Sequence, residues 1–180
     1  MKAKITYKQI GIIHSPFAEP KGTPIQPSAA KDIEGVVEVF PEYQKGLKDI
    51  EGFSHIILIY HFHLSKHYSL EVIPFMDNKP HGLFSTRAPS RPNPIGLSVV
   101  RLKKVEGNKL YVKDIDIVND TPLLDIKPFV GEFDQVGIIK KGWLEKNIVK
   151  LSQSRDDERF IRKLSLKYHP DKHNDSPQKK

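Results

Sequence analysis

Residues 95–118 read IGLSVVRLKKVEGNKLYVKDIDIV, and this stretch indicates the fold most directly. Two runs rich in Val, Ile and Leu flank the turn sequence EGN at 106–108, and this pattern is typical of a β-hairpin. In the second run the apolar phase changes, since the apolar residues of 110–112 share one face and those of 115–117 share the other. A bulge or a sharp bend would produce this change, and both are frequent near barrel rims.

Other segments of the first 149 residues also carry β-branched and aromatic residues. A short helix is expected at 41–48, where Pro41 would occupy the first turn. Little other helix is indicated, so we expect a mainly β domain over 1–149, built as a small barrel or a strongly twisted sheet. The further expected strands are 7–13, 35–40, 54–62, 81–86 and 135–139.

Composition and missing motifs exclude several classes of protein. The chain has 180 residues, enough for one domain, and no Cys, which excludes a disulfide framework, a thiolate nucleophile and a cysteine-ligated zinc. The N-terminus lacks an apolar signal region and no run approaches a membrane span, so we expect a soluble, cytoplasmic protein. No G-x-G and no P-loop sequence occurs, so a nucleotide-type ligand would be bound without a Rossmann fold.

The last 31 residues, 150–180, differ from the rest. They hold nine Lys/Arg against five Asp/Glu, and the whole chain carries a net charge of +7. This charge suits either a solubilising tail or attraction to a polyanion such as RNA. We expect an amphipathic helix over 154–170, with Phe160, Leu164 and Tyr168 on one face, followed by a disordered end.

Three proline-containing loops, at 19–28, 85–94 and 119–128, each adjoin an expected strand, and function is often carried by such loops. In the second loop, prolines restrict the backbone around Arg87 and Arg91, so that these side chains lose less entropy on binding a ligand. Guanidinium groups form paired hydrogen bonds to carboxylate or phosphate, although two arginines on a surface loop remain the simpler interpretation.

His61 and His63 are two residues apart at the end of the expected strand 54–62, and side chains at this spacing on a strand share a face, which is compatible with metal binding. No nearby carboxylate pattern completes a ligand set, so we expect no metal site and interpret these side chains as polar walls of a cleft.

The segments RPNPIGLS, TPLLDIKPF, GTPIQPS and EGFSHIILIYHFH, taken together, closely resemble the TsaA-like family, also named YaeB or TrmO. Its bacterial members are described as S-adenosylmethionine-dependent methyltransferases that modify N6 of threonylcarbamoyladenosine beside the tRNA anticodon. The resemblance covers residues 7–149. It implies a compact, non-Rossmann β-barrel and a homodimer with cofactor pockets at or near the subunit interface.

The resemblance also implies roles for individual residues. The proposed cofactor contacts are Pro24, Ile25 and Gln26 in the first loop, His63 and Leu64 at the end of the central strand, Arg87, Leu97, and Val118, Asn119, Asp120 and Thr121 in the third loop. Arg91, Asn93, Asp125 and Lys127 belong to the same signature, as contacts to RNA or as structural residues; Asp125 and Lys127 could form a structural ion pair. The acceptor nitrogen is weakly nucleophilic, and His63 is the candidate general base, with a polar wall as the alternative.

One departure from the family concerns Asn119-Asp120-Thr121-Pro122, where members usually read Asp-Gly-Thr-Pro. Glycine permits positive φ, which Asp tolerates better than most residues, so the turn can survive. The lost carboxylate nevertheless leaves a non-catalytic protein that binds S-adenosylmethionine or RNA as the alternative to a methyltransferase.

The sequence RKLSLKYHPDKHND resembles the second helix and His-Pro-Asp loop of a J-domain, the module that stimulates Hsp70 chaperones. The loop would be His169, Pro170 and Asp171. A J-domain also needs a preceding and a following helix, and a free helix of this length is marginal in water. A helix docked on the barrel, or a basic RNA-contacting extension, is therefore preferred over a chaperone adaptor.

Overall fold

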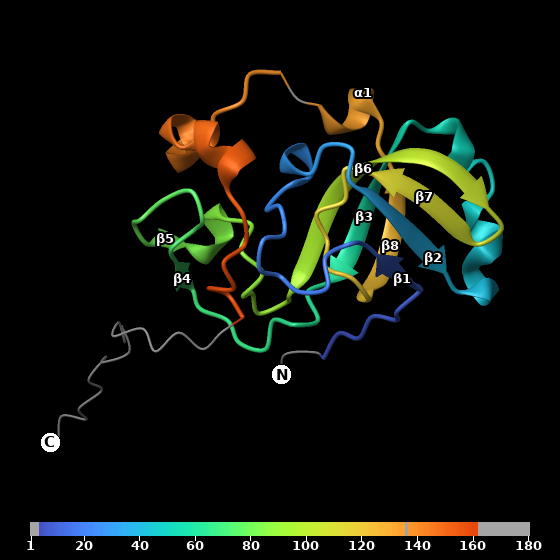
Figure 1. Ribbon diagram of the computed structural model, residues 1–180, viewed down its shortest axis with the longest axis horizontal. Helices are drawn as coiled ribbons and strands as arrows, with labels where there is room; N and C mark the ends of the chain where they lie inside the picture. The colour runs from blue at the N-terminus through green and yellow to red at the C-terminus, as the bar shows by residue number, and fades with distance from the viewer. Residues whose placement is uncertain (1–3, 136, 162–180) are drawn as a thin grey trace, which may run out of the picture.

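The computed structural model describes residues 4–135 and 137–161 and contains a closed barrel of six antiparallel strands (Figure 1). Neighbouring strands follow the order β1-β2-β7-β6-β3-β8 around the barrel. The barrel strands are β1 (Gly11–His14), β2 (Glu34–Val39), β3 (His55–His61), β6 (Ile95–Glu106), β7 (Lys109–Lys113) and β8 (Thr121–Pro128). The prediction of a mainly β barrel is confirmed.

Alternation of side chains along the strands creates the barrel interior. In β3, Ile56, Leu58 and Tyr60 are buried while the residues between them are partly exposed. Since successive side chains of a strand point to opposite faces, one apolar face per strand fills the core. The core also receives residues from every other barrel strand: Ile13, Val37, Val39, Val100, Leu110, Val112 and Leu123.

The β6–β7 hairpin is confirmed. Its register shifts at Lys103 in β6, between Leu102 and Lys104, whereas the change of apolar phase along 110–117 arises where β7 ends. The chain then leaves β7 at Asp114, whose φ of 69° bends the backbone sharply, so that Ile115 and Ile117 are also buried. Arg101 stabilises the bend, since its Nη2 donates to Asp114 Oδ1 at 2.8 Å.

Within the first 149 residues, three expectations for secondary structure were wrong. Residues 119–128, expected as a loop, contain β8, which pairs with both β1 and β3 and so closes the barrel. Residues 81–86 form only β5 (His81–Gly82), paired with β4 (Glu71–Val72), before a 3₁₀ helix, Leu83–Ser85. No strand forms at the described residues of 135–139, which follow the short helix α1 (Gly131–Asp134) and find no strand partner. The helix expected at 41–48 is present as a 3₁₀ helix.

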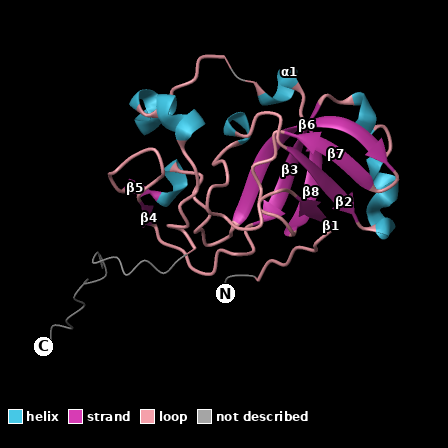
Figure 2. Ribbon diagram, in the orientation of Figure 1, coloured by secondary structure: helices cyan, strands magenta, loops and turns pink. Residues whose placement is uncertain are grey.

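The segment 142–161 lies beside β4 and β5 and away from the barrel (Figures 1 and 2). It contains the 3₁₀ helices Gly142–Lys146 and Ile148–Gln153. Residues 154–161 form a bridge and turns where the start of a helix was expected. The rest of that expected helix, with Leu164, Tyr168 and the His-Pro-Asp loop, lies outside the described residues. Within 4–135 and 137–161, no helix is long and apolar enough to cross a membrane.

Candidate functional site

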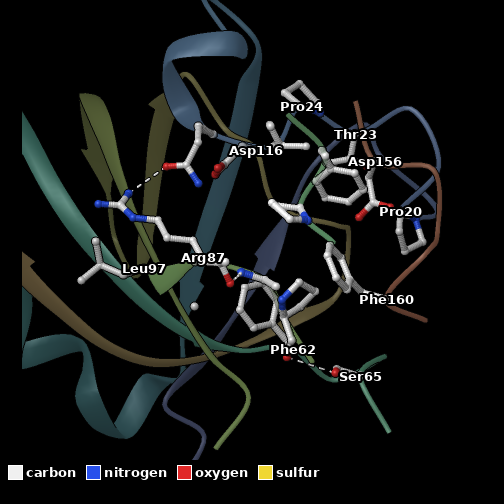
Figure 3. Close-up of a pocket in the computed structure, with 18 of the residues that line it drawn as sticks. Pro20, Thr23, Pro24, Phe62, Ser65, Arg87, Leu97, Asp116, Asp156 and Phe160 are labelled. Atoms are coloured by element: carbon white, nitrogen blue, oxygen red, sulfur yellow. Dashed lines mark hydrogen bonds between the residues drawn. The ribbon is translucent and has the colours of Figure 1, made fainter. Parts of the chain in front are cut away.

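A cavity of about 800 Å³ lies between the end of the barrel and the segment 142–161 (Figure 3). Its volume is within the range of about 300–1,000 Å³ that is usual for small-molecule sites. Each of the three loops singled out in the sequence contributes to its lining, as does the end of β3. The lining includes ten of the residues proposed from the sequence: Pro24, Ile25, Gln26, His63, Leu64, Arg87, Arg91, Leu97, Val118 and Thr121.

The first and second loops are joined by a direct hydrogen bond. Arg87 Nη1 donates to Gln26 Oε1 at 2.8 Å, although the two residues lie 61 positions apart in the chain (Figure 3). Pro24 is buried in the cavity wall, so the first loop is held by packing at Pro24 as well as by the hydrogen bond at Gln26. The guanidinium of Arg87 is exposed toward solvent and retains donors for a carboxylate or phosphate.

Arg91 donates its hydrogen bonds to the backbone of the second loop, to which it belongs. Its Nη1 donates to the carbonyl oxygens of Thr86 at 3.0 Å and Ala88 at 3.3 Å. Ser65, following β3, donates to the carbonyl of Pro89 at 3.1 Å. These bonds fix the proline-rich loop against the barrel and leave Arg87 as the arginine best placed to meet a ligand.

His63 stands at the end of β3 and faces the third loop. Its Nδ1 lies 3.5 Å from Thr121 Oγ1, which itself donates to the carbonyl of Val118 at 2.7 Å. Burial lowers the pKa of His63 below its usual value, and the neighbouring His61 lowers it further. The imidazole is therefore neutral at pH 7 and can accept a hydrogen bond or a proton.

The family departure at Asn119-Asp120 preserves the turn. Asp120 adopts a φ of 59°, the left-handed conformation for which glycine is suited. Asn119 Oδ1 accepts a hydrogen bond from the backbone N–H of Ser15 at 3.0 Å, so this amide connects the third loop to the segment after β1. Neither Asn119 nor Asp120 lines the cavity.

The remaining signature residues also lie outside the cavity lining. Asn93 is exposed in the second loop. Asp125 and Lys127 form an ion pair of 2.8 Å between Lys127 Nζ and Asp125 Oδ2, with about half of each side chain exposed. Asp125 and Lys127 are therefore a structural ion pair on the outer surface of β8, and they do not face inward.

A carboxyl group that the sequence interpretation missed lies in the cavity wall. Asp116 Oδ1 accepts a hydrogen bond from Ser98 Oγ at 2.6 Å, and Ser98 Oγ lies 3.1 Å from the hydroxyl of Tyr60. Burial raises the pKa of Asp116 to about 7, against the smaller opposing effects of the Ser98 hydrogen bond and the Arg87 charge. A signal was present, because Asp116 alternates with the buried Ile115 and Ile117 and must face away from the core.

The C-terminal wall of the cavity was also missed. Phe160 packs edge-to-face on Phe75 with ring centroids 5.0 Å apart. Asp156 exchanges backbone hydrogen bonds with the first loop, to Gly22 and Thr23, and burial raises the pKa of its carboxyl to about 6. No local sequence pattern predicts these contacts, because they depend on where residues 154–161, which follow the barrel strands, pack in the folded protein.

The cavity thus combines apolar surfaces, the exposed guanidinium of Arg87, a neutral imidazole and two carboxyl groups. In the described part of the chain, no group of three or more His, Asp or Glu side chains is placed to hold a metal ion. The arrangement suits a ligand that has both planar apolar and charged parts, and it can accept a proton.

Comparisons with known proteins identify the family of this chain. The model of the family "tRNA-methyltransferase O N-terminal domain" matches residues 12–135. A "probable S-adenosyl-L-methionine-binding protein" of Pyrococcus abyssi is 65% identical, over 87% of this chain and 85% of that protein. The human "tRNA (adenine(37)-N6)-methyltransferase" is 32% identical, over 94% of this chain but only 42% of the human protein.

A crystal structure of TrmO from Pseudomonas aeruginosa superposes with a TM-score of 0.66 at 35% identity, covering 78% of this chain and 63% of that one. The chain therefore spans less than two thirds of these longer relatives. The matched family region contains all three of the segments 19–28, 85–94 and 119–128 and every barrel residue except Gly11, the first residue of β1. The chain belongs to the tRNA-methyltransferase O family.

Proposed function

We propose that this protein binds S-adenosylmethionine in the cavity and transfers its methyl group to N6 of an adenosine in tRNA. The convergence of the first two loops and the start of β8 on one cavity, with the Arg87–Gln26 bond between the two loops, is the observation that carries this proposal. Relatives named as S-adenosylmethionine-binding proteins and as a tRNA (adenine-N6)-methyltransferase support it.

The chemistry of the cavity fits this donor. Arg87 offers a guanidinium to the donor's carboxylate or to an RNA phosphate. Leu97 and Val118 provide apolar surface for a planar base, and the carboxyl group of Asp156 is suited to a cationic sulfonium or ammonium. When bound, S-adenosylmethionine supplies a methyl group already activated by the sulfonium.

The protein's main contribution is therefore position and exclusion of water. Holding the acceptor nitrogen in line with the methyl carbon can lower the activation free energy, relative to the reaction in solution, by on the order of 7 kcal/mol. The braced second loop, with Arg91 bonded to its own backbone, keeps the cavity wall in one conformation. His63, neutral at pH 7, is a candidate for accepting the proton that leaves the acceptor nitrogen.

The proposed acceptor is the threonylcarbamoylated adenosine beside the anticodon. The assay incubates the protein with S-adenosylmethionine and either threonylcarbamoylated or unmodified tRNA, followed by mass spectrometry of the nucleosides. Methylated product with the modified tRNA only is the expected result. Product on both tRNAs would refute the substrate assignment, and donor binding without any product would refute the enzyme.

A second candidate, a binding protein without turnover, is favoured by one observation. Asn119 stands where the family usually has an aspartate, so this carboxylate is replaced by an amide, and Asp120 stands in place of the family's glycine. The double substitution Asn119→Asp with Asp120→Gly separates the candidates. A wild-type protein that binds the donor but turns over only after this substitution would identify the binding protein.

We also propose that the protein is a homodimer and that its basic charge attracts the anticodon arm of tRNA. The outer faces of β3 and β6 place Ile59 directly opposite Leu97, and Leu97 and Ile95 are 49% and 36% exposed. Because Leu97 also lines the cavity, an interface on this face would adjoin the cofactor site. Light scattering that gives the mass of a single chain would refute the dimer. The net charge of +7 predicts tRNA binding that weakens as salt rises.

A further inference from the structure

Asp116 is positioned by two buried hydroxyl groups that belong to the barrel core. Ser98 on β6 and Tyr60 on β3 are only 1% and 5% exposed. Ser98 Oγ donates its proton to Asp116 Oδ1 at 2.6 Å, so the Tyr60 hydroxyl, 3.1 Å away, must be the donor to Ser98. The series Tyr60 to Ser98 to Asp116 therefore runs in one direction and ends on the carboxyl.

The carboxyl group at the end of this series is directed to the cavity. Ile115 and Ile117 turn into the core, and Asp116 and Val118, between and after them, both line the cavity (Figure 3). Among the described residues, the hydrogen bond recorded from another side chain to Asp116 uses Oδ1 alone, which leaves Oδ2 available to a ligand.

Methyl transfer to a urea-like nitrogen must release a proton. As the nitrogen forms its bond to the methyl carbon, the carbon–sulfur bond breaks and its electron pair remains on sulfur as a neutral thioether. The nitrogen would become cationic unless its N–H proton is transferred to a base in the same enclosed space.

We propose that Asp116 is a catalytic residue whose carboxylate Oδ2 accepts the N6 proton during methyl transfer, with Ser98 and Tyr60 as positioning residues. This inference rests on the proposed function and assigns the proton acceptor within that site. The protonated carboxyl then loses its proton to solvent after the products leave, so the base is regenerated without a further reagent.

The surroundings of Asp116 favour this role at neutral pH. Tyr60 from β3, Ser98 from β6 and Arg87 from the second loop are the polar groups that act on it, and His63 and Asp156 line the same cavity. Burial places the pKa of Asp116 at about 7, so the carboxylate is a stronger base than an exposed one yet is still ionised in much of the protein.

The first test compares kcat as a function of pH in wild type, Asp116→Asn, His63→Gln and the control Glu106→Gln, an exposed residue of the β6–β7 turn. Wild-type kcat should rise about tenfold per pH unit below pH 7 and then level off. Asp116→Asn should lower kcat by roughly 100-fold and abolish this rise, with a donor Kd within about threefold of wild type. Loss of the rise in His63→Gln, with the rise retained in Asp116→Asn, would overturn the proposal in favour of the imidazole.

Two further measurements keep the proposal testable. Ser98→Ala removes a hydrogen bond that lowers the carboxyl pKa, so the rise in kcat should move to higher pH, whereas a merely structural role would leave its position unchanged. Without any turnover, the ¹³C resonance of Asp116, assigned with the Asn variant, should titrate near pH 7, and titration near 4 would overturn the proposal. Absence of product from wild type would refute the proposed function; product from Asp116→Asn with the wild-type pH profile would refute only the role of Asp116.

Discussion

The raised pKa of Asp116 makes a quantitative prediction about stability. In the unfolded chain an aspartate ionises near 3.8, whereas in the folded protein burial holds Asp116 protonated up to about pH 7. A group whose folded pKa is raised stabilises the protein below the unfolded pKa, and this contribution is lost as pH rises through the folded pKa. Wild type should therefore lose stability relative to Asp116→Asn between about pH 4 and pH 7.

The magnitude follows from the same two values. A rise from 3.8 to about 7, at about 1.4 kcal/mol for each pH unit, corresponds to about 4 kcal/mol. Water that reaches the half-buried residue screens part of this cost, so the measured change should be about 2–4 kcal/mol. Asparagine keeps the oxygen that accepts from Ser98 and has no charge to bury.

The assay is urea unfolding of wild type and Asp116→Asn at intervals between about pH 4 and pH 8. As pH rises, the free energy of unfolding of wild type should fall relative to that of Asp116→Asn. The difference between the two proteins should become constant above about pH 8. Glu106→Gln is the matched control, because the Lys104 ammonium lowers the pKa of Glu106 and its contribution has the opposite sign. A difference between wild type and Asp116→Asn that stays constant within about 0.5 kcal/mol would refute the reasoning.

Three other substitutions test packing and the cavity wall. Gly96→Ala should lower the free energy of unfolding by about 1–3 kcal/mol, because a Cβ there would overlap the ring of Tyr60; Gly82→Ala, which meets open space, is the control, and equal losses would contradict the packing. Arg101→Ala should lower the free energy of unfolding measured in urea, since Asp114 would lose its guanidinium partner, and a loss that does not shrink in high salt would count against the ion pair. Phe160→Ala should weaken S-adenosylmethionine binding about tenfold in calorimetry, because Phe160 lines the cavity. An unchanged Kd would show that residues 154–161 do not contribute to binding.

Much of the barrel could be predicted because its signals are local. In strands β2, β3 and β6, apolar residues recur at alternate positions within a few residues. The sequence Glu106-Gly107-Asn108 predicts the turn between β6 and β7. Strand β8 was missed because Pro122 and Pro128 at its two ends suggested a loop. Its strand conformation depends on β1 and β3, which pair with it on either side.

The candidate site was predictable where a residue type carries its own chemistry. Arg87 was identified by its guanidinium on a proline-restricted loop, and the structure joins it to Gln26. Asp125 and Lys127, equally prominent in the sequence, pair with each other on the outer surface. Direction relative to the cavity separates these cases, and direction is a property of the closed barrel.

By itself, the sequence determined the mainly β architecture, the β6–β7 hairpin and the first two of the loops on which the site is built. Each follows from spacing between near neighbours, which any chain with that pattern would share. Only the tertiary structure decided that Asp116 is withdrawn from water: burial among distant segments raises its pKa, and the hydrogen bond from Ser98, 18 residues away, lowers it by a smaller amount. Desolvation depends on every segment that excludes water from a group, and those segments meet only when the chain has folded.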